Sequence, residues 1–332
     1  MRSRFAPSPT GLLHVGNARS AVLNWAYTQK NKGEFILRID DTDINRCKKE
    51  FEISIKENLD WLGLKWNRTF NQSSRKNIYE EHINQLKDLK RIYPCFETAE
   101  ELSLKKKALL SSGKPPIYDR ASLRLSQEEI NKKLSQGFKP HWRFKLEDKI
   151  ISWNDSIKGK VSFDSKNLSD PILIRGDGSL LYHLPSVVDD IKEEITDIIR
   201  GEDHISNTAY HIQLFESFNS KIPNFAHHPF LTDQKGKGFA KRLGSLSIES
   251  LKNDGYENIT ILNYLLNIGS SEDINPETKI DNIVNNFDLK NISNSSAKFS
   301  DNVLISLNSD VLKIYDYEQI KSKIKLSKNN ID

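Results

Sequence analysis

The sequence contains little cysteine and no long hydrophobic segment. Cysteine occurs only twice in 332 residues, at Cys47 and Cys95, which excludes a disulfide framework and fits a reducing cytosol. No run of about eighteen apolar residues occurs, and the N-terminus lacks the charged and apolar regions of a signal peptide. We therefore expect a cytoplasmic protein that is neither exported nor inserted into a membrane.

The chain also has little excess charge of either sign. Its 49 Lys and Arg residues against 45 Asp and Glu residues give a net charge of +4. Any nucleic acid would therefore bind to local basic patches rather than to a global positive field. A hydrophobic content of 37% with 28% charged residues is ordinary for a globular protein, and 332 residues favour two or three domains.

What is present is an unusual N-terminal segment between residues 4 and 17. We expect a short buried strand, then a turn that Pro7 and Pro9 stiffen by fixing their own φ angles and extending the residues before them. A helix should follow, because apolar residues recur at the spacing of one helix face that packs on a sheet: Ala18, Ala21, Val22, Trp25 and Ala26.

The first turn of this helix is expected to carry His14, Gly16 and Asn17. A helix N-terminus has free N–H groups and a partial positive charge, and a glycine permits close approach. With an imidazole beside it, such an end is suited to bind a nucleotide phosphate. The alternative at this point is a proline-rich connector with a surface histidine.

A second expected strand, residues 34–39, is followed by Asp40, Asp41 and Asp43. These carboxylates lie at the C-terminal end of the strand, where ligands bind in open α/β sheets. They could hold an ammonium group or a metal ion, or they could only cap the next helix. Helices are expected between residues 49 and 87, with a break at residues 62–63.

A third expected strand, residues 195–199, is rich in isoleucine, and Arg200 emerges at its C-terminal end. Because an unpaired buried guanidinium is costly, Arg200 should meet either a protein carboxylate or an anionic substrate. A helix over 206–218 and a strand over 225–231 should follow.

Two other stretches are basic. Between residues 88 and 178, Arg120, Arg124 and Lys132 could neutralise RNA phosphates, although a solvated helix face would explain basic residues as well. Residues 235–248 form a glycine-rich cationic stretch that could fold over the phosphates of ATP, or could be an ordinary flexible loop.

Four of these segments resemble signatures of the glutamyl-tRNA synthetases. Residues 4–17 resemble R-x-A-P-S-P-T-G-x-x-H-x-G, that family's version of the class I HIGH motif, and residues 38–43 resemble R-I-E-D-T-D. Residues 182–204 are similar to Y-H-L-x-x-V-V-D-D…I-R-G-E-D-H, and residues 235–248 to K-L-S-K-R-x-G. The chain departs from these patterns at three positions, with Asp40 for glutamate, Gly238 for lysine and Ala240 for serine.

The resemblance implies an α/β fold of the class I synthetase type: a Rossmann-like parallel sheet, an inserted α+β acceptor-binding domain and a C-terminal helical stem-contact domain. The implied divisions are the first half of the catalytic domain (1–87), the insertion (88–178), the second half of the catalytic domain (179–234), and the lysine loop with the stem-contact domain (235–332). Full-length relatives continue into an anticodon-binding domain, so we expect a short form that lacks it.

The resemblance also implies the site residues. Those implied to contact ATP are His14, Gly16, Asn17, Lys241 and Arg242. Those implied to bind glutamate are Arg4, Ser8, Asp40, Tyr182 and Arg200. His14 and Lys241 would be the catalytic residues, since both could stabilise negative charge on phosphate.

The implied partners are tRNA(Glu), L-glutamate and ATP with Mg²⁺, acting on a monomeric enzyme. Some relatives bind zinc in the insertion, but here Glu97 and Ser122 stand where cysteines would accompany Cys95. We therefore expect no zinc, because too few ligands remain for a tetrahedral site. The alternatives are a glutamyl-queuosine tRNA(Asp) synthetase and a noncatalytic tRNA-binding module derived from a synthetase.

Overall fold

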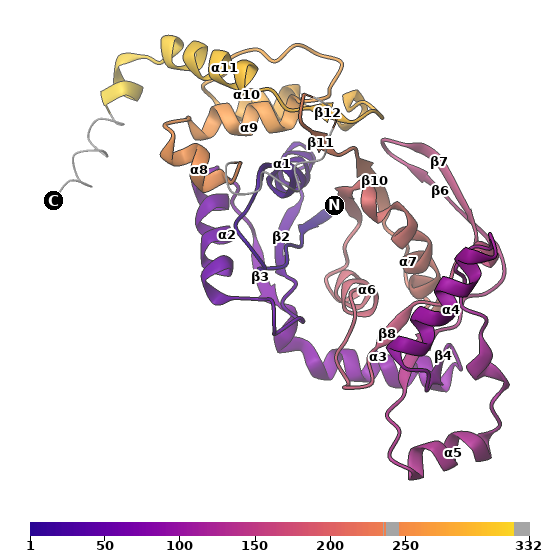
Figure 1. Cartoon of the computed structure of the whole chain (residues 1–332). Coiled ribbons are helices and arrows are strands. Elements are labelled where there is room, and N and C mark those ends of the chain that lie inside the picture. The colour runs from indigo at the N-terminus through magenta and orange to yellow at the C-terminus, as the bar shows by residue number, and fades with distance from the viewer. Residues whose placement is uncertain (235, 237–245, 322–332) are drawn as a thin grey trace.

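The computed structural model, which describes residues 1–234, 236 and 246–321, is a mixed α/β fold around a central sheet (Figure 1). The strand order is β3-β2-β1-β9-β10-β6-β7, and all neighbours except β6 and β7 run parallel. The strands are β1 (Arg2–Phe5), β2 (Glu34–Ile39), β3 (Arg68–Asn71), β6 (Ile150–Asp155), β7 (Gly159–Asp164), β9 (Asp197–Gly201) and β10 (Asn224–His228). The predicted fold class, with its mainly parallel sheet, is confirmed.

Helices cover both faces of this sheet. Leu37 and Ile199 enter a hydrophobic core on the side of α1, whereas Ile36 and Ile198 enter a second core on the opposite side. This follows from the strand period of two, which sends successive side chains to opposite faces. The helices that cover the faces are α1 (Val15–Lys30), α3 (Lys76–Asp88), α6 (His183–Lys192) and α7 (Ile205–Ser217).

The region expected as an insertion, residues 88–178, divides between two sheets. Its separate antiparallel sheet has the order β4-β5-β8, while β6 and β7 join the edge of the central sheet beside β10. Its helices α4 and α5 begin with capping boxes and bury no residue, so they project from the body of the molecule. The bounds are β4 (Ile92–Cys95), α4 (Ala99–Ser111), α5 (Gln127–Ser135), β5 (His141–Phe144) and β8 (Ile172–Ile174).

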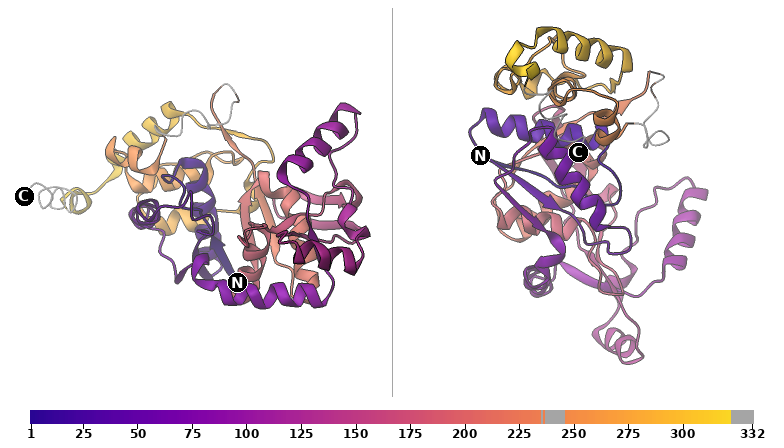
Figure 2. Two further views of the ribbon diagram at one scale, coloured as in Figure 1. Left: turned by 60° about the horizontal axis from the view of Figure 1, so that its bottom comes forward. Right: turned by 90° about the vertical axis from the view of Figure 1, so that its left-hand side faces the viewer.

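The C-terminal helices lie at the opposite end of the molecule from α5 (Figures 1 and 2). They share a hydrophobic core with α1, and the short strands β11 and β12 pair in parallel beneath them. None of the helices in the described ranges has the length and apolar character needed to cross a membrane. The elements are β11 (Leu231–Thr232), α8 (Ile248–Asn253), α9 (Asn258–Asn267), α10 (Ile280–Asn286), β12 (Ala297–Lys298) and α11 (Asp301–Ile314).

Several predicted boundaries differ from the structure. The strand over 34–39 is confirmed as β2, but the strand expected over 195–199 lies two residues later as β9. The region expected to be only helical, 49–87, contains α2 (Lys49–Trp61) and α3 but also the edge strand β3. The strand expected over 225–231 is shorter, because β10 ends at His228 and the chain continues to β11.

Arg19 attaches α1 to the C-terminal part of the fold. Its side chain is fully buried, and its two terminal nitrogens donate to the carbonyl oxygens of Pro229, at 3.0 Å, and of Ile268, at 2.6 Å. Burial lowers the pKa of Arg19 to about 10. Gly269, next to one of these carbonyls, has φ +76°, and a Cβ built there would lie 2.7 Å from the Cβ of Ala297.

We therefore expect Gly269→Ala to lower the free energy of unfolding by about 2 to 4 kcal/mol, combining left-handed backbone strain with overpacking. Gly113→Ala is the matched control, because Gly113 has φ +66° but open space around it, and it should cost only about 1 kcal/mol. Urea denaturation of both variants measures the difference. Equal losses would show that contact with Ala297 is unimportant.

Candidate active site

A cavity of about 520 Å³ opens at the C-terminal ends of the central parallel strands. It is bounded by the turn after β1, the N-terminus of α1, and the residues that follow β2, β9 and β10. Eight of the ten residues predicted to contact ATP or glutamate line this one cavity: Arg4, Ser8, His14, Gly16, Asn17, Asp40, Tyr182 and Arg200. The other two, Lys241 and Arg242, lie outside the described residues.

The α1 end of the cavity is closed by His14, which is the N-cap of the helix. Its Nδ1 accepts hydrogen bonds from the backbone N–H groups of Gly16, at 3.1 Å, and Asn17, at 3.4 Å. The expectation of free N–H groups at this end is wrong for these two, because the histidine side chain uses them. A Cβ at Gly16 would lie 3.0 Å from the imidazole, which explains the glycine.

This contact fixes the protonation state of the ring. Burial lowers the pKa of His14, so the imidazole is neutral at pH 7. Because Nδ1 accepts, the one ring proton lies on Nε2. His14 therefore presents a neutral N–H donor to the cavity. This donor lies at the N-terminus of α1, the positive end of the helix dipole.

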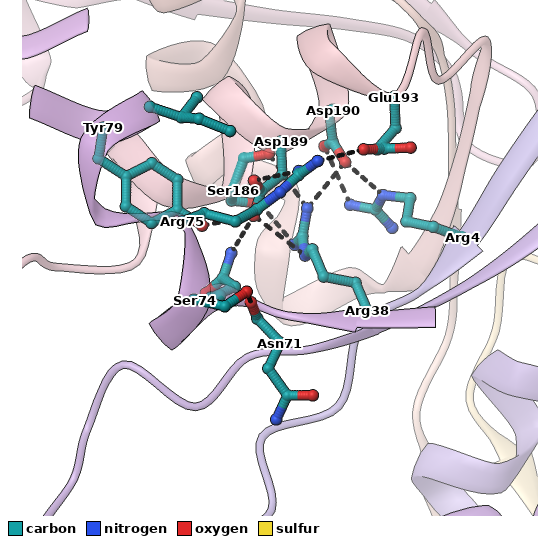
Figure 3. Close-up of polar contacts among 12 residues, drawn as sticks. Arg4, Arg38, Asn71, Ser74, Arg75, Tyr79, Ser186, Asp189, Asp190 and Glu193 are labelled. Carbon is teal, nitrogen blue, oxygen red and sulfur yellow. Dashed lines mark hydrogen bonds and ion pairs between the residues drawn. The ribbon is translucent and has the colours of Figure 1, made fainter. Parts of the chain in front are cut away.

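The strands β1 and β2 bring Arg4 and Arg38 to the cavity, where both pair with Asp190 of α6 (Figure 3). Arg4 Nε lies 3.0 Å from Asp190 Oδ1, and Arg38 Nη1 lies 2.9 Å from the same oxygen. Asp189 accepts from Arg75 at 2.7 Å. These buried charges are all paired, as their removal from water requires.

Asp40, the residue predicted to hold an amino group, forms a bidentate pair with Arg38, with Nε to Oδ1 at 2.6 Å and Nη2 to Oδ2 at 3.1 Å. Burial raises the pKa of Asp40 to about 6, against the opposing charge of Arg38. Each carboxylate oxygen has a second lone pair. Asp40 can therefore still accept from a ligand at the edge of the cavity.

Arg200 is the arginine of this cavity that has no carboxylate partner among the residues that the structure describes. Only 6% of it is exposed, and its hydrogen bonds go to neutral groups: Nη1 to Tyr182 Oη (2.9 Å), Nη2 to Thr208 Oγ1 (2.7 Å) and Nε to His227 Nε2 (3.2 Å). Burial lowers its pKa. Of the two predicted possibilities, pairing with a described protein carboxylate is excluded.

A family model described as tRNA synthetases class I (E and Q), catalytic domain, matches residues 1–306. The chain is 48% identical over 324 residues to glutamate–tRNA ligase 1 of Rickettsia massiliae, covering 97% of this chain and 72% of the relative. The chain belongs to the class I tRNA synthetases of the E and Q type.

Other members of this synthetase family are similar over the same range. Identity to the glutamate–tRNA ligase of Azospirillum brasilense is 46% over 324 residues, covering 97% of this chain and 73% of the relative. A crystal structure of a glutamate tRNA ligase from Elizabethkingia meningosepticum, in complex with its amino acid, matches with a TM-score of 0.89 and 30% identity. That match covers 100% of this chain and 74% of the other.

Within residues 88–178, the three residues predicted to contact RNA differ in their surroundings. Arg124 and Lys132 are exposed, so they remain candidates for phosphate contacts. Arg120 instead forms a bidentate pair with the buried carboxylate of Asp170, with both N–O distances at 3.0 Å. Its guanidinium therefore joins parts of the segment 88–178 and is not free to contact a phosphate.

The residues predicted to stand in place of zinc ligands form a hydrogen-bonded cluster. Glu97 accepts from Tyr118 Oη and from Ser122 Oγ, both at 2.9 Å, and Tyr118 Oη also lies 3.7 Å from Cys95 Sγ. Burial raises the pKa of the Cys95 thiol to about 11. Within the described ranges, no group of three or more His, Cys, Asp or Glu side chains has an arrangement that could hold a metal ion.

Four residues around the cavity were not predicted from the sequence: Arg38, Asp190, Asp155 and His227. Arg38 and Asp190 lie inside residues 38–43 and 182–204, which resemble the synthetase signatures, and a charge inside a buried strand or helix is itself a signal. Asp155 and His227 gave no such signal, because they meet only through the pairing of β6 with β10.

His14 acts as a helix cap whether or not it acts on a ligand, and this can be tested by stability. Replacing His14 with Ala should lower the free energy of unfolding by about 1 kcal/mol, because the N–H groups of Gly16 and Asn17 lose their acceptor. His14→Asn places an amide oxygen where Nδ1 was and should preserve stability within about 0.5 kcal/mol. Chemical denaturation of both variants tests this, and equal destabilisation would contradict a capping role.

Proposed function

We propose that this chain attaches L-glutamate to tRNA(Glu) in two steps. First, a carboxylate oxygen of glutamate attacks the α-phosphorus of ATP, which forms glutamyl-adenylate and releases pyrophosphate. Next, the 2′-hydroxyl of the terminal adenosine of the tRNA attacks the acyl carbon and releases AMP. The observation that carries the proposal is Arg200, a buried guanidinium at the cavity with only neutral partners among the described residues.

Glutamate is proposed to bind with its side-chain carboxylate on Arg200 and Tyr182. Arg4 already shares its charge with Asp190, so Arg200 carries most of the uncompensated positive charge. Ser8 and Asp40 would then hold the amino end, through the lone pairs that Arg38 leaves free on Asp40. A buried arginine rejects glutamine strongly, because the amide would leave the guanidinium without a countercharge.

ATP is proposed to bind at the α1 end of the cavity, beside Gly16 and Asn17. The Nε2–H of His14 would donate to a phosphate oxygen, and Lys241 and Arg242, which precede α8 in the sequence, would add positive charge. The described residues offer no metal cluster of their own. Mg²⁺ would therefore be held by the phosphate oxygens of ATP, where it would supply further neutralisation of negative charge.

The acceptor end of the tRNA is proposed to reach the cavity past the insertion. Arg124 and Lys132 are exposed there, and a second cavity of about 480 Å³ is lined by Lys105, Lys106 and Lys114. Phosphate contacts from such side chains carry affinity without sequence information and weaken as salt rises. We propose that residues 88–178 provide this surface without zinc, with Glu97 and its hydrogen-bond donors in place of a metal.

Charging of tRNA(Glu) is favoured over the queuosine and noncatalytic alternatives. The relatives compared above carry the name glutamate–tRNA ligase, and the described cavity keeps the eight glutamate and ATP residues together. The domain boundaries at residues 87, 178 and 234 are proposed on the same resemblance. The strands β6 and β7 belong to the proposed insertion in sequence but lie in the central sheet.

The decisive test is glutamate-dependent exchange of pyrophosphate into ATP, with and without tRNA, followed by charging of tRNA(Glu). Arg200→Gln should raise the KM for glutamate at least about a hundredfold, because the substrate carboxylate loses its countercharge. Arg91→Gln is the matched control, since Arg91 pairs with Glu147 away from the cavity. Wild-type protein without exchange, or an unchanged KM in Arg200→Gln, would contradict the proposal.

Asp40 should make glutamate binding depend on pH. Only the ionised carboxylate attracts an ammonium group, and the pKa of Asp40 is raised to about 6. The KM for glutamate should therefore rise about tenfold between pH 7 and pH 5, as the ionised fraction falls. Asp40→Asn should have a high KM that is flat over this range. A slope that persists in Asp40→Asn would assign the titration to another group.

A further inference from the structure

Three neighbouring strands place Asp155, His227 and Arg200 in a line behind the cavity. His227 of β10 lies directly opposite Arg200 of β9 in the strand register, and Asp155 ends β6 on the other side of β10. His227 Nδ1 lies 2.5 Å from Asp155 Oδ2, and its Nε2 lies 3.2 Å from Arg200 Nε. Both His227 and Asp155 are buried, with side chains that are 0% exposed.

The direction of these hydrogen bonds is determined by chemistry. An arginine nitrogen can only donate, so His227 Nε2 must accept. Burial lowers the pKa of His227, which keeps the ring neutral. Its one proton therefore lies on Nδ1 and is donated to Asp155.

Asp155 is held as an anion in this position. Its Oδ1 accepts from the backbone N–H groups of His227, Ile157 and Lys158, at 3.0 to 3.1 Å. Burial opposes ionisation, but the bonds from His227 and the backbone lower its pKa to about 2. The carboxylate is thus a fixed acceptor that leaves His227 one available tautomer.

We propose that His227 is a positioning residue for Arg200, and that Asp155 acts through it by fixing the tautomer in which Nε2 accepts. This deepens the proposed function, on which it rests. His227 accepts a hydrogen bond from Nε of Arg200 but leaves the positive charge of the guanidinium uncompensated, because the imidazole ring is uncharged. Thr208 and Tyr182 hold the terminal nitrogens, so the guanidinium keeps its orientation and its full charge toward a substrate carboxylate.

The substitution Asp155→Asn should change the tautomer of His227. The three backbone N–H groups keep Oδ1 as their acceptor, so the amide nitrogen takes the place of Oδ2. It would donate to His227 Nδ1 and move the ring proton to Nε2. Nε2–H would then face Arg200 Nε–H, so Arg200 Nε would lose its acceptor, and the ring proton could be accepted only by Thr208 Oγ1, 3.0 Å from Nε2.

The test compares His227→Leu, His227→Gln and Asp155→Asn with His82→Leu. Glutamate affinity is measured by calorimetry, and the KM values for glutamate and ATP are measured in the exchange assay with tRNA. His227→Leu and Asp155→Asn should weaken glutamate binding about tenfold or more and leave the KM for ATP within about twofold. His227→Gln keeps an acceptor oxygen and should stay within about threefold. His82 is another buried histidine, in α3 against Phe218 and outside the cavity, so His82→Leu should leave glutamate affinity unchanged.

The double variant separates action through His227 from an independent effect. Adding Asp155→Asn to His227→Leu should weaken glutamate binding no further, because no tautomer remains to be fixed. Multiplying losses would overturn the role of Asp155. His227→Leu with unchanged glutamate affinity, or with equal losses for glutamate and ATP, would overturn the role of His227. A wild-type chain that binds glutamate but lacks exchange contradicts the proposed function, while the calorimetric comparison still decides the inference.

Discussion

Charge is distributed unequally among three arginines that the central strands bring to one cavity. Arg4 of β1 and Arg38 of β2 both reach Asp190 of α6, whereas Arg200 of β9 has neutral partners among the described residues. A buried ion pair costs desolvation on both sides, and loss of one partner is more costly still. Because α6 places Asp190 beside Arg4 and Arg38, these two guanidinium groups are ion-paired, whereas no described carboxylate compensates the charge of Arg200.

At the other end of the cavity, one side chain has two functions. His14 closes the first turn of α1 with Nδ1, and that bond leaves Nε2 as the donor. A side chain with only one polar atom could not cap the helix and also donate a hydrogen bond into the cavity. The stability of the helix and the chemistry of its N-terminus thus depend on one imidazole whose tautomer is set by the backbone.

The sequence predicts the sheet and most of the cavity, but not the pairing of its charges. The limits of β2 follow from the apolar residues 35–37 and 39 after the glycine at 33, whereas β3 was missed because it lies at the sheet edge and its first two residues are exposed. Residues 4–17 and Arg200 could be predicted as parts of a ligand site because each lies near the C-terminal end of an expected strand. Whether Arg200 meets a carboxylate depends on distances across strands, which spacing along the chain does not determine. The capping role of His14 was missed because helix caps are usually Ser, Thr, Asp or Asn.

The sheet order also gives the segment 88–178 a place in the central sheet. Its hairpin β6-β7 lies beside β10, and the last residue of β6 is Asp155. A parallel strand added at this edge buries the outer side of β10, on which His227 would otherwise have no ionised partner. This segment therefore does more than form a separate sheet, because it supplies a buried anion two strands away from Arg200. A shift of β6 by one residue would turn Asp155 to the opposite face of the sheet, since side chains alternate along a strand. The register of β6 therefore determines whether Asp155 can reach His227, which in turn contacts Arg200.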